Sequence, residues 1–275
     1  MEAEYPALLA AIEFAGRHPL VIFMACLSLL LLAVGIAVRL LHRYPVEAAG
    51  EHHPLRYLLA RLMMGFVVIV GCGALFAGLA DEIEIDEDLA PMDDRFTQTL
   101  ASNTPAAAVR IFAYMTHLGD PWMLTVIGIV VAIILLLRRQ PWLAGAWAIA
   151  LVGNALLNPA LKSVFTRMRP LDMYGMPFTD GWSFPSGHAS GSVVTYGMLA
   201  YVLIRNLPQR WHLPIILLAA ALAFSVGWSR IFLQFHFGSD VLAGFASGSA
   251  WLAVCITTIE ALRWQRVWQP KSPQP

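Results

Sequence analysis

The stretch GWSFPSGHAS, residues 181–190, leads directly into an apolar run that predicts a helix over residues 188–205. Pro185, Ser186, Gly187 and His188 lie together at the mouth of that helix. A plain chain of Leu and Val at this place would enter a membrane more easily. The four residues therefore indicate a role at the helix start other than insertion.

Composition places the chain among membrane proteins. Of its 275 residues, 58% are hydrophobic and 13% are charged, against roughly 25% charged in an average soluble domain. The net charge is zero, so nothing global favours a nucleic-acid partner. The cysteines lie inside apolar runs, which predicts buried thiols and no disulfide.

The apolar stretches predict an all-α fold, a polytopic transmembrane helical bundle. A helix of about 20 apolar residues can span the ~30 Å hydrocarbon layer. A six-helix core is expected over residues 58–262, preceded by an N-terminal extension, 1–57, with one extra span, and followed by a disordered tail, 263–275. The expected helices cover residues 20–40, 58–80, 121–137, 142–162, 188–205, 213–231 and 240–262.

Arginine placement predicts the orientation of these helices through the positive-inside rule. Four basic clusters are therefore expected in the cytoplasm, with the N-terminus outside and the C-terminus inside. Three connections, 81–120, 163–187 and 232–239, then face outward. The clusters are Arg39, Arg43, Arg56 and Arg61; Arg138 and Arg139; Arg205 and Arg210; and Arg263, Arg266 and Lys271.

The first outward connection begins with the acidic run DEIEIDEDLAPMDD, residues 81–94. Runs of like charge are usually solvated, so we expect an outer loop that leads into an interfacial helix at 93–116. A surface that steers divalent cations or headgroups is the alternative. The spacing does not match a calcium-binding loop, which disfavours a metal site.

The segment KSVFTRMRP, residues 162–170, ends the fourth predicted span. Lys162 and Arg169 are seven residues apart, so on a continuing helix they share one face and can converge on one anion. Arg167 points elsewhere on such a helix. Pro170 disfavours helical geometry at Arg169 and predicts the helix end. The alternative is that both cations extend to the headgroup layer.

The PSGH segment, residues 185–188, predicts an anion seat. A helix that starts near His188 leaves its first N–H groups unpaired and its positive dipole end exposed, which suits a phosphate. Gly187 allows close backbone approach and Ser186 adds a hydroxyl donor. Ser186 as an ordinary helix cap beside an interfacial histidine is the alternative.

The segment SRIFLQFHFGSD, residues 229–240, joins the sixth and seventh predicted spans. His236 and Asp240 are four residues apart, so the carboxylate can accept the imidazole Nδ1–H and leave Nε2 as base or nucleophile. Arg230 adds a cation at the same end. Taken alone, these residues also fit an interfacial ion pair and a helix cap.

All three segments are expected at one membrane face, which independent caps and interfacial cations would not produce. Together, K-x6-RP, PSGH and SR-x5-H-x3-D resemble the complete signature of the type-2 phosphatidic acid phosphatase family, whose soluble relatives include the vanadium haloperoxidases. The resemblance covers residues from about 58 to 262, and the extra span at 20–40 departs from the family's six-helix core.

The resemblance implies a role for each matching residue. His236 would attack phosphorus, Asp240 would orient it, and His188 would protonate the leaving oxygen. The phosphoryl oxygens would be held by Lys162, Arg169, Arg230, Ser186 and the Gly187 amide. Phosphoryl transfer mainly requires positioning and positive charge, so no cofactor and no metal ion are expected.

The expected function is hydrolysis of a lipid phosphate or diphosphate at the outer face of a bacterial inner membrane. The resemblance allows undecaprenyl diphosphate, phosphatidylglycerol phosphate and phosphatidic acid as substrates. Transfer of the phosphoryl group to a second lipid such as lipid A, and non-catalytic lipid binding or transport, are the alternatives. Gly244 and Gly248 predict close helix packing, with a homodimer as the alternative.

Overall fold

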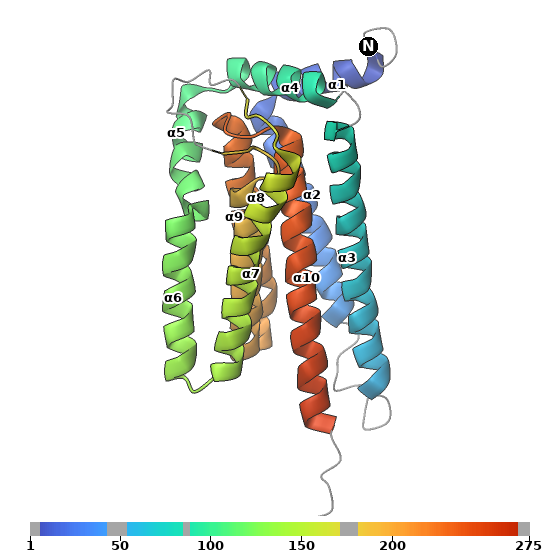
Figure 1. The fold of residues 1–275 in the computed structure, drawn as a ribbon, viewed down its shortest axis with the longest axis vertical. Helices are drawn as coiled ribbons and strands as arrows, with labels where there is room; N and C mark the ends of the chain where they lie inside the picture. Colours follow the sequence, from blue (N-terminus) through green and yellow to red (C-terminus); the bar gives the residue numbers. More distant parts are fainter. Residues whose placement is uncertain (1–5, 43–53, 85–88, 171–180, 269–275) are drawn as a thin grey trace, which may run out of the picture.

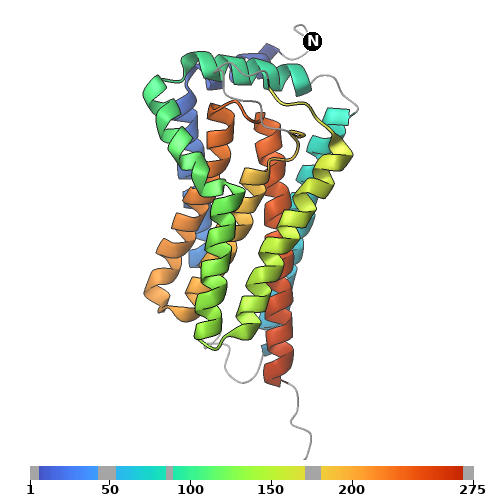
Figure 2. The ribbon, with the colours of Figure 1, turned by 60° about the vertical axis from the view of Figure 1, so that its left-hand side comes forward.

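The computed structural model of the chain describes residues 6–42, 54–84, 89–170 and 181–268. Within these ranges the regular elements are helices, so the predicted all-α fold is confirmed. Long helices run side by side, and the short helices α1 (Pro6–Arg17) and α4 (Leu89–Asn103) lie across one end of them (Figure 1). The teal α4 has the same crosswise position in the second view (Figure 2).

A long helix is present at each of the seven predicted positions. Several begin with proline, whose fixed φ suits a first helical residue and which has no N–H to leave unpaired there. The helices are α2 (Pro19–His42), α3 (Pro54–Glu84), α6 (Pro121–Leu137), α7 (Pro141–Phe165), α8 (Gly187–Asn206), α9 (His212–Phe232) and α10 (Gly238–Trp268).

Not every long helix is apolar enough to cross a membrane by itself. Five described segments are, within α2, α3, α7, the stretch Gln209–Phe232 and α10. A sixth would be formed by Ala106–Gly119 and α6, which are bent by 47° at their junction. The helix α8 falls outside this set because it carries polar residues such as Ser190, Ser192 and Thr195, which are buried among its neighbours α7, α9 and α10.

The outward faces of the bundle are apolar. Large exposed side chains on α2, α3 and α7 include Leu29, Phe66, Ile149 and Leu156. A continuous apolar exterior of this kind would be unfavourable in water and suits hydrocarbon chains. The chain is therefore an integral membrane protein, and its high hydrophobic content lies largely on the outside.

The prediction of a single interfacial helix over 93–116 is wrong. The segment is broken into α4, α5 (Ala106–Met115) and the 3₁₀ turn η1 (Thr116–Gly119). Pro105, the N-cap of α5, has no N–H for a continuous helix, and proline disfavours helical geometry in the residue before it. The predicted disordered tail, 263–275, is helical in its first residues, because α10 continues to Trp268. The rest of the tail, 269–275, and residues 85–88 of the acidic run lie outside the described residues.

The helix α1 was not predicted from the sequence. It packs against α4, and Glu13 of α1 accepts a hydrogen bond from Arg95 of α4 at 2.6 Å. The pair covers the same end of the bundle at which Lys162 and Arg230 lie, near the last turn of α7 and of α9.

Gly244 and Gly248 bring α10 against α8, as the G-x-x-x-G spacing predicts. A Cβ atom on Gly244 would lie 2.6 Å from the carbonyl oxygen of Ser186, and one on Gly248 would lie 2.8 Å from that of Ser190. Both contacts involve the backbone of α8, which cannot rotate away. The pair therefore packs within one chain.

Replacing Gly244 by Ala should destabilise the bundle by about 1–3 kcal/mol, the usual result of overpacking against rigid neighbours. The control is Gly73→Ala in α3, where nothing lies within 4 Å of the new Cβ. Thermal unfolding in detergent should show a lower midpoint for Gly244→Ala only. Equal midpoints for the two variants would contradict this packing.

Candidate active site

One end of the bundle collects the polar residues singled out from the sequence. His188 lies in the first turn of α8, and Asp240 in the first turn of α10. His236 lies in the short connection between α9 and α10. The last turns of α7 and α9 bring Lys162 and Arg230 to the same end. Helices that run in alternating directions thus deliver residues from distant parts of the chain to one place.

A serine hydroxyl links His236 to Asp240. Ser183 Oγ donates to Asp240 Oδ2 at 2.5 Å and lies 3.1 Å from His236 Nδ1, whereas the imidazole and carboxylate atoms are themselves 3.5 Å apart. Since the hydroxyl proton goes to the carboxylate, Ser183 accepts the Nδ1–H of His236. This assignment leaves Nε2 of His236 unprotonated. Ser183 was not predicted as a site residue, although it lies in the stretch 181–190, two residues before Pro185.

Arg167 holds Asp240 from the other side. Its Nη1 donates to Asp240 Oδ1 at 2.8 Å, and its Nη2 donates to Asp93 Oδ2 of α4 at 3.0 Å. Ser239 joins the group, because its hydroxyl accepts from Arg167 at 2.6 Å and donates to Asp93. Arg167 therefore connects α4 to the start of α10.

The expectation that Arg167 points away from the site is wrong. It assumed that the helix continues to Arg169, but α7 ends at Phe165 and its C-cap, Thr166, has a left-handed φ of 38°. This turn carries Arg167 inward, where its side chain is buried. No periodicity in the sequence reveals such a turn at a threonine.

Lys162 and Arg169 nevertheless converge. Lys162 Nζ donates to the carbonyl oxygen of Ser183 at 3.1 Å and also to that of Trp182. Arg169 donates to the carbonyl oxygens of Gly181 at 3.1 Å and Phe235 at 2.8 Å. Its Nη1 lies 3.3 Å from Nε2 of His236. A guanidinium group thus faces the unprotonated nitrogen.

Arg230 is a buried cation with one unpaired N–H group among the described residues. Its Nη1 donates to Thr116 Oγ1 at 2.8 Å, and its guanidinium lies 4.2 Å from the ring centre of Phe235. Its Nε is buried and has no hydrogen-bond partner among the described residues. A buried unpaired donor is costly, so this N–H suits an anion that enters the site.

A second carboxylate holds His188. Asp120, in the turn before α6, lies 2.9 Å from His188 Nε2 through its Oδ1 and 2.7 Å from His117 Nδ1 through its Oδ2. Trp122 Nε1 also donates to it, at 3.1 Å. The sequence analysis did not single out Asp120. The sequence feature that could have identified it is a lone carboxylate directly before Pro121 and the apolar run of α6.

The PSGH segment packs tightly on its neighbours. Ser186 is the N-cap of α8, where its Oγ accepts from Ala189 N at 3.5 Å, while its own N–H donates to the Asp240 carbonyl at 2.9 Å. A Cβ on Gly187 would lie 2.9 Å from Asn158 Oδ1. Asn158 in turn donates to the Pro185 carbonyl at 3.3 Å, which ties the segment to α7.

Burial sets the protonation of the central histidine. Loss of solvent lowers the pKa of His236 to about 3, and the nearby Arg230 and Arg169 add to this effect although Asp240 opposes it. Burial also lowers the pKa of Arg169 and raises that of Asp93. His236 is therefore neutral near pH 7, as a nitrogen nucleophile must be.

The polar end of the bundle lies largely within the segment that matches a known family. Residues 142–264, which include all three motifs, match the family model of the PAP2 superfamily. This segment of the chain belongs to the PAP2 superfamily. The PAP2 segment contains α8, α9 and nearly all of α7 and α10, whereas Asp93 and Asp120 lie outside it.

Two curated relatives and one solved structure resemble this chain. Phosphatidylglycerophosphatase B of Bacillus subtilis (strain 168) is 32% identical over 136 residues, 49% of this chain and 66% of that protein. Undecaprenyl-diphosphatase of Sulfolobus acidocaldarius is 28% identical over 137 residues, 48% of this chain and 62% of that protein. The matches thus span just under two thirds of either relative.

The structural match is broader. The crystal structure of a transmembrane PAP2-type phosphatidylglycerolphosphate phosphatase from Bacillus subtilis aligns with a TM-score of 0.67 and 25% identity. The alignment covers 71% of this chain and 98% of that structure. The helical bundle is therefore the fold of a transmembrane PAP2 protein.

Replacing Arg167 by Gln should destabilise the protein by about 3–5 kcal/mol, since it leaves two buried carboxylates, Asp93 and Asp240, without their cation. Thermal unfolding in detergent measures the effect. The matched control is Arg110→Gln on the exposed side of α5, which should leave the midpoint within a degree or two. Similar midpoints for both variants would show that Arg167 does not hold this end together.

Acid should destabilise the wild type partly through His236. Its pKa is about 3 when folded and about 6.5 when unfolded, so between these values only the unfolded state binds the proton. This stability is complete above about pH 6.5 and is lost as the pH falls toward 3. The loss of melting temperature from pH 7 to pH 4.5 should be smaller in His236→Gln than in the wild type. An identical loss of melting temperature in both proteins would contradict the lowered pKa of His236.

Proposed function

We propose that this PAP2 protein is a membrane-embedded phosphatase that hydrolyses the phosphomonoester or diphosphate of a lipid through a phosphohistidine at His236. The observation that carries the proposal is Nε2 of His236, which is left unprotonated by Ser183 and lies beside Arg169. A binding protein would need the cations but not an oriented, neutral nitrogen.

In the first step, His236 Nε2 attacks phosphorus and forms a P–N bond while the P–O bond to the lipid breaks. His188 must enter this step as an imidazolium, with its Nε2–H held by Asp120, and donates its Nδ1 proton to the leaving oxygen. The phosphoryl anion beside it favours that charged form. Ser183 and Asp240 stabilise the positive imidazole that forms, because the Nδ1–H remains hydrogen-bonded. A phosphoryl group that enters between His236 and Arg169 would accept the hydrogen bond that Arg169 now directs at Nε2.

In the second step, water attacks phosphorus and the P–N bond breaks. His188 now takes a proton from that water, and His236 leaves as a neutral imidazole. Inorganic phosphate is the product. Two steps that use the same pair of histidines return the site to its starting protonation.

Three cations would hold the phosphoryl oxygens: Lys162, Arg169 and Arg230. They lie within electrostatic range of one another. At an effective dielectric constant near 20, one cation about 4 Å from a unit anion contributes on the order of 4 kcal/mol before desolvation. The Ser186 hydroxyl and the Gly187 amide would add donors at the start of α8. This charge supports turnover without a metal ion.

The relatives' names narrow the substrate class. By their names, one relative acts on a phosphatidylglycerophosphate and the other on undecaprenyl diphosphate. Both substrates carry a phosphate at the end of a lipid, as does phosphatidic acid. We include all three in the proposed class, because the cation cluster recognises the terminal phosphate that they share.

The proposed site faces away from the cytoplasm. Arg138, Arg139, Arg205 and Arg210 lie at the opposite end of the bundle, in the turns after α6 and α8. The positive-inside rule assigns that end to the cytoplasm. The N-terminus would then be outside, the C-terminus inside, and the membrane a bacterial inner membrane.

Phosphate release by the purified protein tests the proposal. The assay uses phosphatidylglycerol phosphate, undecaprenyl diphosphate and phosphatidic acid in detergent with EDTA. His236→Ala should lower release by about a thousandfold or more, because the nucleophile is lost, and EDTA should have no effect on the wild type. The control is His212→Ala at the far end of α9, which should retain near-normal release.

Two outcomes would overturn this function. Near-normal release by His236→Ala would exclude the phosphohistidine. Transfer of the phosphate to a second lipid, with none released as inorganic phosphate, would make the protein a phosphotransferase that uses the same nucleophile.

A further inference from the structure

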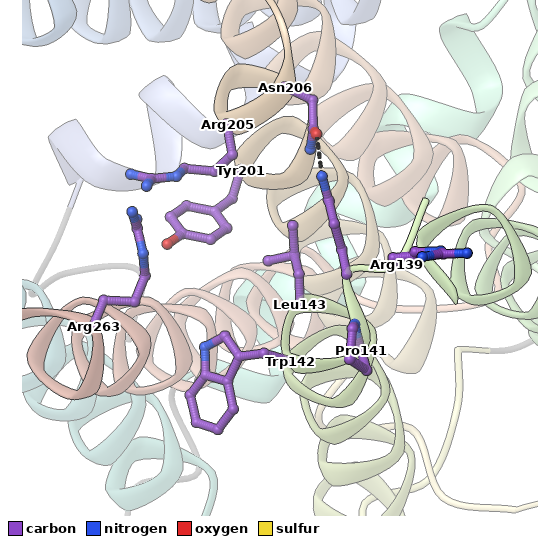
Figure 3. Close-up of a pocket in the computed structure, with 9 residues that line it drawn as sticks. Arg139, Pro141, Trp142, Leu143, Tyr201, Arg205, Asn206 and Arg263 are labelled. Carbon is purple, nitrogen blue, oxygen red and sulfur yellow. Dashed lines mark hydrogen bonds between the residues drawn. The ribbon is translucent and has the colours of Figure 1, made fainter. Parts of the chain in front are cut away.

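A cavity of about 310 Å³ lies at the end of the bundle opposite His236. It is open on one side and is lined by the first turn of α7 and the last turns of α8 and α10 (Figure 3). Its volume is at the lower end of the range for small-molecule sites. The lining residues are Arg139, Gln140, Pro141, Trp142, Leu143, Tyr201, Arg205, Asn206 and Arg263.

Positive charge is in excess beside this cavity. Glu260 Oε1 is shared by Tyr201 Oη at 2.5 Å, Arg263 Nη1 at 3.3 Å and Arg205 Nη1 at 3.6 Å. The other oxygen, Oε2, receives Arg61 at 2.6 Å. One carboxylate therefore meets three guanidinium groups, and these four side chains carry a net charge of about +2.

The donors also outnumber what Glu260 can accept. A carboxylate oxygen has two lone pairs, whereas each guanidinium has five N–H groups. Figure 3 shows the heads of Arg205 and Arg263 on the same side of the cavity as the Tyr201 hydroxyl, while the head of Arg139 points away from them. The N–H groups of Arg205 and Arg263 that Glu260 does not take can reach a second anion.

The remaining lining favours a ligand with polar and apolar parts. Gln140 donates through Nε2 to Asn206 Oδ1 at 2.8 Å, but its buried Oε1 has no partner among the described residues. A hydroxyl group of a ligand could donate to that oxygen. Pro141, Trp142 and Leu143 supply an apolar wall on the side of α7.

We propose that this cavity binds a phosphate group, held by Arg205 and Arg263. Guanidinium groups match phosphate in geometry and charge, and basic pockets between membrane helices suit anionic headgroups. The phosphate belongs either to an anionic phospholipid in the leaflet at this end or to free phosphate. Arginines that only fix the topology would not need to converge on one cavity. The proposal is independent of the proposed catalytic roles.

Ligand-dependent thermal stability of the full chain, purified and stripped of lipid in detergent, tests the site. The probes are dihexanoyl phosphatidylglycerol, inorganic phosphate, and dihexanoylglycerol, which lacks the phosphate. The variants are Arg263→Gln and Arg205→Gln. Arg138→Gln is the control, because it removes the same charge at the same end of the bundle and does not line the cavity.

For the wild type and Arg138→Gln, phosphatidylglycerol should raise the melting temperature and dihexanoylglycerol should not. Both cavity variants should need at least about tenfold more phosphatidylglycerol for the same rise. Stabilisation by inorganic phosphate with the same dependence on Arg263 would identify free phosphate as the ligand. If inorganic phosphate does not stabilise the protein, the lipid headgroup is the ligand. Any binding at the end with His236 is common to all variants and cancels in the comparison.

Equal titrations for Arg263→Gln, Arg205→Gln and Arg138→Gln would overturn the proposal. Gel filtration confirms that each variant is folded. Arg205→Gln decides if Arg263→Gln aggregates, since Arg205 is the more distant of the two arginines from Glu260. Phosphate release is not measured in this test, so its failure is distinct from failure of the phosphatase proposal.

Discussion

The site depends on the burial of one carboxylate. Asp240 has no exposed surface, and its oxygens accept from Arg167, Ser183 and the Phe237 amide. Its carbonyl oxygen also accepts from the N–H of Ser186. A buried anion is tolerated only when it is fully paired, so these partners must be held in place. They fix the 181–186 segment, the start of α10 and, through Arg167, the end of α7.

The same constraint explains why α4 lies across this end. Asp93 of α4 shares Arg167 with Asp240 and also binds Ser239. Gln234 Nε2 adds a contact to the Thr97 carbonyl oxygen of α4, at 3.1 Å. The crosswise helix therefore completes the charge balance of the site as well as covering it. Changes in α4 can act on the orientation of His236 without contact with a substrate.

The two ends of the bundle differ in how their charges are paired. Near His236, anions anchor the proposed nucleophile while the cations Arg169 and Arg230 remain able to meet a phosphate. At the far end, one carboxylate is surrounded by cations. Near His236 burial makes an unmatched charge costly, whereas the far-end guanidinium groups are partly exposed and outnumber the one carboxylate between them. Both ends thus favour an anion that the chain itself does not supply, and the proposed phosphate ligands follow from that demand.

Apolar runs and motif spacing predicted the helices and the family, since both are properties of neighbouring residues. The positions of α2, α3, α6, α7, α8, α9 and α10 follow from such runs. Lys162, Arg169, His188, Arg230, His236 and Asp240 could be selected for their residue type at helix ends. The close helix packing at Gly244 and Gly248 could be predicted for the same reason, because the two glycines share one helix face.

The partners of these residues required the tertiary structure. Ser183, Arg167, Asp93 and Asp120 are ordinary polar residues, and what distinguishes them is contact across distant parts of the chain. The left-handed turn at Thr166 and the break at Pro105 decide two of these contacts. The sequence determined which groups are proposed to carry the chemistry, because side-chain type and helical spacing are local. Only the fold decided what orients them, since long-range packing and a single backbone turn set those distances.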